Sequence, residues 1–100
     1  MMAKERTICK AEYPALIRAV YGKYERGSWV YADLVVVAEE MGISLYPSLM
    51  LALRMSGWIN PVSEGGAVLR RQGHGKAYGP KYWAVSSAGA KKSGALEAAT

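Results

Sequence analysis

The sequence has one cysteine, one histidine and one aspartate in 100 residues, and these scarcities exclude several kinds of site. Cys9 alone can form neither an internal disulfide nor a cysteine metal cluster. His74 has no cysteine or histidine companion, so we expect a loop histidine without a metal. Cys9 also lacks an organised catalytic triad, which favours a spectator thiol. We therefore expect a protein that is not an enzyme and needs no cofactor.

Long apolar runs are also absent. No stretch is long enough to span a bilayer, and the first ten residues show no run of signal-peptide length. We therefore expect a cytoplasmic protein with no membrane partner, and no small-molecule substrate is evident.

Basic residues are plentiful: 13 lysines and arginines stand against 8 acidic residues, giving a net charge of +5 and a pI near 9.5. The hydrophobic fraction of 51% is typical of a folded chain, and 100 residues suffice for one domain. A small basic domain favours a polyanionic partner.

Apolar residues at three- and four-residue spacing predict three helices. Their ranges are Lys10–Arg26, Ala32–Met41 and Tyr46–Ser56. The short, β-prone segment 28–31 between the first two is interpreted as a strand or an extended connector.

A tight turn at residues 41–44 is predicted to join the second and third helices. Gly42 can adopt the left-handed conformation that closes a helix, and Ile43 would fill the space between the helices. Ser44 would cap the next helix, with Pro47 in its first turn. This pattern is typical of a helix-turn-helix.

Two β-prone runs follow the helices, at Ala67–Arg71 and Lys81–Ser86, and a glycine-rich loop at residues 72–79 separates them. They predict a β-hairpin. We interpret residues 1–10 as a basic lead-in, 11–89 as the domain, and 90–100 as a flexible or weakly helical tail.

Three helices followed by a hairpin resemble the winged helix-turn-helix family. The residues that carry the resemblance are AEEMGIS at 38–44, GWI at 57–59 and YWAVSSAG at 82–89. The chain is similar to MarR-like and PadR-like regulators, and to winged domains of phage and plasmid replication proteins. The resemblance implies an α+β fold, with helix three as the DNA-recognition helix and the hairpin as the wing.

The third helix departs from that pattern because it offers few side chains that read bases. Leu49 and Leu53 should face the core, and one helix buries only one stripe. Some of the other large apolar residues must therefore be exposed or covered by a partner. The candidates for such a protein interface are Met50, Leu51 and Met55.

Two functions remain open. The first is binding of double-stranded DNA by a small transcriptional regulator or a phage or plasmid accessory factor. The second is a protein-interaction module on the same fold, such as a homodimer or a small mobile-element inhibitor. The basic hairpin residues could contact phosphates, or they could form a charged hairpin that keeps an edge from aggregating. The candidate DNA-binding residues are Ser44, Tyr46, Ser48, Arg54, Arg70, Arg71, His74, Lys76 and Lys81.

Overall fold

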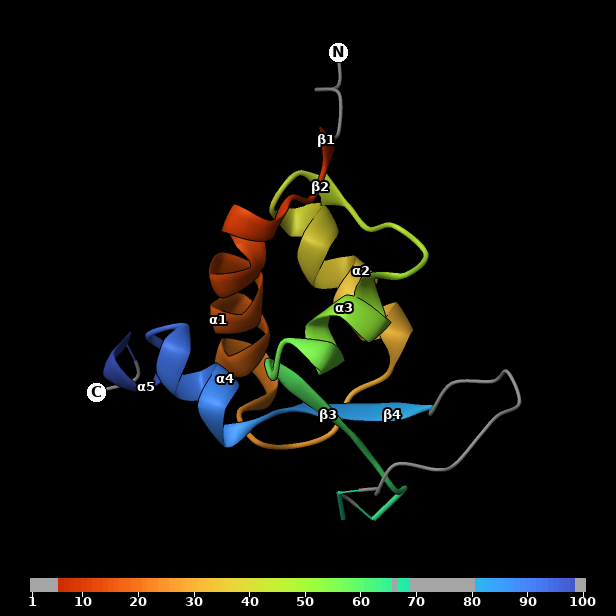
Figure 1. The fold of residues 1–100 in the computed structure, drawn as a ribbon, viewed down its shortest axis with the longest axis vertical. Coiled ribbons are helices and arrows are strands. Elements are labelled where there is room, and N and C mark those ends of the chain that lie inside the picture. The colour runs from red at the N-terminus through yellow and green to blue at the C-terminus, as the bar shows by residue number, and fades with distance from the viewer. Residues whose placement is uncertain (1–5, 66, 69–80, 99–100) are drawn as a thin grey trace.

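The computed structural model describes residues 6–65, 67–68 and 81–98, and shows an α+β fold (Figure 1). Helices α1, α2 and α3 stand together on one side of the antiparallel strands β3 and β4, and α4 and α5 lie beside α1. The elements in chain order are β1 (Arg6–Thr7), a 3-10 turn (Lys10–Glu12), α1 (Tyr13–Tyr24), α2 (Tyr31–Glu40), β2 (Ile43–Ser44), α3 (Leu49–Met55), β3 (Ile59–Val62), β4 (Tyr82–Val85), α4 (Ser87–Lys92) and α5 (Ala95–Ala98). None of the described helices is long and apolar enough to cross a membrane.

The first two helices lie where the sequence pattern places them, but α1 is shorter than the predicted Lys10–Arg26, because residues 10–12 form a 3-10 turn and the chain leaves the helix at Glu25, whose φ is positive. Helix α1 buries Tyr13, Leu16, Ile17 and Val20 and carries Pro14 in its first turn, where no backbone donor is lost. Helix α2 differs from the predicted range by one residue at each end. The Asp33 carboxylate accepts a hydrogen bond of 3.0 Å from the backbone N–H of Val30 and so caps α2.

The predicted tight turn between α2 and α3 is wrong. Gly42 has a φ of +75°, as expected, but the chain then extends as β2, which pairs in parallel with β1. Helix α3 begins at Leu49, three residues later than predicted, and its N-cap position is Ser48 rather than Ser44. Pro47 therefore precedes the helix. The local capping signals could not reveal that the N-terminal strand holds this segment in an extended conformation.

The predicted hairpin pairing is also wrong. Strand β4 pairs with β3, from Ile59 opposite Val85 to Val62 opposite Tyr82, and residues 67–68, the described part of the predicted strand at 67–71, are not paired with it. Val68 forms an isolated bridge to Val62, and residues 69–80 lie outside the described part of the chain. On its other side β4 meets Trp29, whose backbone exchanges two 2.8 Å hydrogen bonds with Trp83. The segment at 28–31 thus contributes a sheet contact.

Asn60 and Pro61 both lie within β3, although an Asn-Pro pair is typical of a turn. Pro61 is opposite Trp83, and the backbone groups of Trp83 point toward Trp29. Pro61 therefore occupies a pair that makes no hydrogen bonds between β3 and β4. The missing N–H of the proline removes no hydrogen bond from this pair of strands.

Helices meet the sheet in a core that includes two tryptophans. Trp29 and Trp83 are buried, whereas Trp58 is half-buried against the core. The Trp29 indole N–H has no hydrogen-bond partner among the described residues. The core includes Leu16, Ile17, Val20, Leu34, Val37, Ile43, Leu49, Leu53, Ile59 and Val85.

The two ends of the described chain are tied to this core more closely than expected. In the predicted lead-in, β1 pairs with β2 and Ile8 is buried. In the predicted tail, α4 and α5 pack against α1 and bury Ala90, Ser93 and Ala95. Small side chains permit this close packing, although they give little helical periodicity in the sequence.

Candidate nucleic-acid interface

Helix α3 buries one stripe and exposes the opposite one. Leu49 and Leu53 are fully buried, as the sequence predicted. The outward stripe consists of Ser48, Leu51 and Met55, and the last two are 58% and 77% exposed. We call these three residues the α3 stripe. Its two large members are apolar, so it offers little chemistry for reading base edges.

The remaining α3 candidates lie beside this stripe. Met50 is half-buried and packs against the core, so it is less available to a partner than Leu51 or Met55. Arg54 is partly exposed and is the only basic residue of α3. It is the α3 side chain best suited to a phosphate or a carboxylate.

Two candidate DNA-binding residues, Ser44 and Tyr46, hold the start of α3 in place. The Ser44 carbonyl accepts a 3.0 Å hydrogen bond from the backbone N–H of Ile8. The Tyr46 hydroxyl is hydrogen-bonded to that of Tyr13, on α1. Both residues are partly buried, and each ties the segment before α3 to the N-terminal part of the chain.

The Tyr13–Tyr46 contact affects ionisation. Burial raises the pKa of Tyr13 to about 12, and the hydrogen bond and charge interaction with Tyr46 act in the same direction. Tyr13 is therefore neutral at physiological pH, and its hydrogen bond to Tyr46 links α1 to the segment before α3.

Four hairpin candidates, Arg70, Arg71, His74 and Lys76, lie outside the described residues. Lys81 is exposed, and its ammonium lies 5.6 Å from the ring centre of Tyr82. This separation permits a weak cation–π contact and leaves the ammonium accessible to an anion.

Charge is distributed unevenly along the chain. Residues 1–53 contain six basic and six acidic side chains, whereas residues 54–100 contain seven basic and two acidic ones. The whole net charge of +5 therefore belongs to the part that begins at the end of α3 and includes the segment between β3 and β4.

Sequence reasoning did not single out the basic end of α4. The Lys92 ammonium donates a 3.0 Å hydrogen bond to the Ser56 carbonyl and lies 4.2 Å from the ring centre of Trp58. Lys91 is exposed beside it. The contact of Lys92 caps the end of α3, where a cation is favoured by the helix dipole.

The motif at residues 86–89 explains how α4 reaches that position. The Ser86 hydroxyl donates to the Gly57 carbonyl at 2.6 Å and accepts from the Gly89 N–H at 2.8 Å. A Cβ on Gly89 would lie 2.2 Å from the Trp58 carbonyl oxygen. The serine and the glycine thus serve helix capping and close backbone packing.

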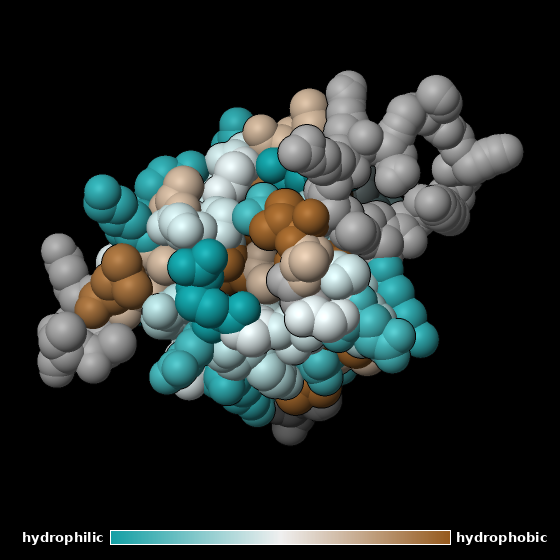
Figure 2. All heavy atoms as spheres, turned by 90° about the horizontal axis from the view of Figure 1, so that it is seen from below, coloured by the Kyte–Doolittle hydropathy of each residue, from teal (hydrophilic) through white to brown (hydrophobic). Residues whose placement is uncertain are grey.

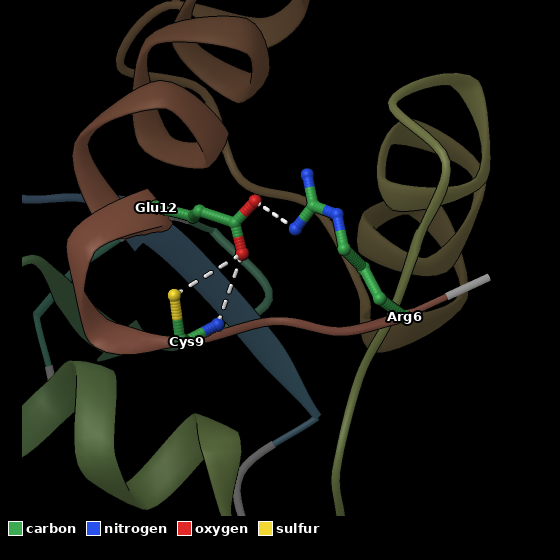
Figure 3. A network of polar contacts seen from close by, with 3 residues as sticks. All are labelled: Arg6, Cys9 and Glu12. Carbon is green, nitrogen blue, oxygen red and sulfur yellow. Dashed lines mark hydrogen bonds and ion pairs between the residues drawn. The ribbon is translucent and has the colours of Figure 1, made fainter.

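A separate polar network surrounds Cys9 (Figure 3). The Glu12 carboxylate pairs with Arg6 and accepts hydrogen bonds from the Cys9 backbone N–H at 3.1 Å and the Cys9 thiol at 3.5 Å. The hydrogen bond from Arg6, followed by that from the Cys9 backbone, lowers the pKa of the Glu12 carboxyl. A thiol that donates to a carboxylate is poorly placed to act as a nucleophile.

Within the described ranges, no group of three histidine, cysteine or acidic side chains could hold a metal ion. Seen from below, the hydrophobic side chains form separate patches among polar ones rather than one continuous surface (Figure 2).

No protein-family model, curated protein or solved structure matches the chain.

Proposed function

We propose that this chain is a winged helix-turn-helix domain that binds double-stranded DNA mainly through the phosphate backbone. The observation that carries the proposal is the concentration of the net charge in residues 54–100. The supporting feature is the chain order of α1, the sheet contact of Trp29, α2, α3 and the antiparallel strands β3 and β4, with the short strand β2 between α2 and α3. In a winged helix, the third helix and the segment between the last two strands face the DNA. The basic half of this chain includes the end of the third helix, at Arg54, and the segment between the last two strands.

The character of α3 indicates how such binding occurs. Leu51 and Met55 project from the face that would approach the major groove, and they lack the paired donors and acceptors that distinguish bases. Arg54 and the basic residues after β3 can contact phosphates of any sequence. We therefore expect binding with low sequence specificity and a strong dependence on salt, as suits an accessory factor or a regulator.

The test is binding of a fluorescent random-sequence duplex over a salt series. We expect the logarithm of the association constant to fall linearly with the logarithm of salt concentration. Replacing Arg70, Arg71 and Lys76 with alanine should weaken binding to every sequence. The slope should decrease by about 0.9 for each phosphate that the variant no longer neutralises.

A matched control replaces Lys10, Lys23 and Arg26 with alanine. This variant loses the same three charges but from the neutral half of the chain, so it should retain most of the salt slope. If both triple variants lose the same DNA affinity, the effect comes from net charge alone and not from residues 70–76. If the wild-type chain does not bind DNA at low salt, the proposal is refuted.

The exposed apolar part of the α3 stripe favours a second candidate function, a protein-interaction module. Leu51 and Met55 are on adjacent turns of one helix face and are both mostly exposed. Exposed leucine and methionine suit an adaptable protein-binding surface. The two functions can coexist, since phosphate contacts come chiefly from other residues.

A further inference from the structure

A shallow groove of about 160 Å³ lies between α2 and the segment that follows it. Four aliphatic side chains line it: Val35, Ala38, Ile43 and Leu45. Glu39 and Tyr31 complete the lining with polar atoms, together with Ser44. A space of this size accommodates about one large apolar side chain.

Among the described residues that line the groove, the charged one is acidic, Glu39. Helix α2 carries three acidic residues and no basic one. Asp33 caps the helix, and Glu40 pairs with Lys23 at 3.1 Å, whereas Glu39 forms no ion pair with any described residue. The carboxyl end of the helix dipole adds to this negative potential. The groove therefore suits an apolar side chain that has a cationic neighbour.

The end of α3 has this combination. Met55 is the most exposed of the large apolar residues in the described chain, and its neighbour Arg54 makes no ion pair there. Because Met55 is 77% exposed and is not among the groove residues, it does not fill the groove of its own chain.

We propose that the groove receives Met55 of a second copy of this chain, with Arg54 of that copy paired to Glu39. The proposal rests on the second candidate function, in which the α3 stripe binds protein, and it names the partner and the receiving site. When each copy places its Met55 in the groove of the other, the contact is self-complementary and closes as a two-fold dimer. The small size of both features predicts a reversible dimer.

The experiment is sedimentation equilibrium of the full chain without DNA, over protein concentrations from about 1 µM to about 1 mM. We expect the mean mass to rise from monomer toward dimer. Met55→Glu should abolish the rise, since it places a carboxylate in an apolar groove beside Glu39. Leu96→Glu, which changes an exposed leucine on α5, should leave the association unchanged.

Charge reversal tests the ion pair separately. Glu39→Arg and Arg54→Glu should each weaken dimerisation by about threefold to tenfold, and the double variant should restore it. Glu64→Arg reverses an exposed acid elsewhere and should have no such effect. Far-UV circular dichroism should show unchanged helical content in every variant.

Each outcome decides the proposal. A wild-type chain that stays monomeric throughout overturns it, as does a dimer that Met55→Glu leaves intact or a double variant that does not recover. Because no DNA is present, failure to dimerise would leave the DNA-binding proposal standing. A chain that dimerises but does not bind DNA would remove only the DNA-binding proposal.

Discussion

At the scale of single residues, the structure assigns different roles to glycines that look alike in the sequence. Gly42, Gly57 and Gly94 adopt positive φ angles, so a side chain at any of them would strain the backbone. Gly89 is needed for space, because α4 approaches the carbonyl of Trp58. Gly22 lies within α1 and faces open space. The cost of replacing a glycine therefore depends on its surroundings.

Gly89→Ala should lower the free energy of unfolding by about 1–3 kcal/mol, because backbone atoms would have to shift to admit the new methyl group. Gly22→Ala is the matched control and should raise it by about 0.5–1 kcal/mol, since alanine is the better helix former. Urea unfolding followed by circular dichroism measures both changes. A neutral Gly89→Ala would show that α4 does not approach Trp58 this closely.

A pair of leucines on α3 tests which stripe of the helix is buried. Leu53→Ala should cost about 2–5 kcal/mol, because it leaves a cavity in a fully buried site. Leu51→Ala should change the stability of the monomer by no more than about 0.5 kcal/mol, since Leu51 is mostly exposed. Chemical denaturation at low protein concentration compares them, and equal losses would contradict the orientation of α3.

At the scale of elements, the N-terminal strand and the Tyr13–Tyr46 pair fix where α3 begins. Strand β1 pairs with β2, and Ile8 donates a backbone hydrogen bond to Ser44. Tyr46 in turn accepts, through its carbonyl, a hydrogen bond from the backbone N–H of Leu49, the first residue of α3. The position of the helix thus depends on residues far away in the sequence.

The pH dependence of stability should reveal the tyrosine pair. The pKa of Tyr13 is raised from 10.0 to about 12 in the folded chain, so folding favours the neutral phenol. This contribution is fully present below pH 10 and is lost as the pH rises through 10 toward 12. In Tyr13→Phe, the decrease in unfolding free energy over this range should be smaller than in the wild type. Urea titrations at stepped alkaline pH measure it, and identical profiles would exclude the contribution.

At the scale of the whole molecule, the C-terminal helices complete the domain. Helices α4 and α5 contact α1, and Arg18 donates a 3.0 Å hydrogen bond from its Nε to the Ser93 carbonyl. Ala90 and Ala95 are almost fully buried. The described chain therefore encloses its core with residues from both halves.

A chain that ends at Ser86 should melt at a lower temperature and with less cooperativity than the full chain, because the surface of α1 beneath α4 and α5 becomes exposed. Thermal unfolding followed by circular dichroism measures this change. Removal of residues 99–100 alone is the control and should have little effect. An unchanged melting midpoint in the chain that ends at Ser86 would show that α4 and α5 add nothing to the core.

The sequence by itself determined the elements whose signals are local. Periodic apolar residues predicted α1 and α2 closely, the buried leucines of α3 followed from four-residue spacing, and Gly42 indicated a left-handed turn. The same spacing showed that α3 has more large apolar residues than one stripe can bury, and the structure leaves Leu51 and Met55 exposed.

Tertiary structure decided what depends on contacts between distant segments. Ile43 and Ser44 form a strand because β1 lies beside them. Strand β4 pairs with β3 on one side and contacts Trp29 through Trp83 on the other. Ser86 and Gly89 have their roles, a hydrogen bond to Gly57 and close packing on Trp58, because α4 lies against the end of α3. A hydrogen-bond ladder is completed by whichever strand the fold brings alongside, and local propensity does not specify that strand.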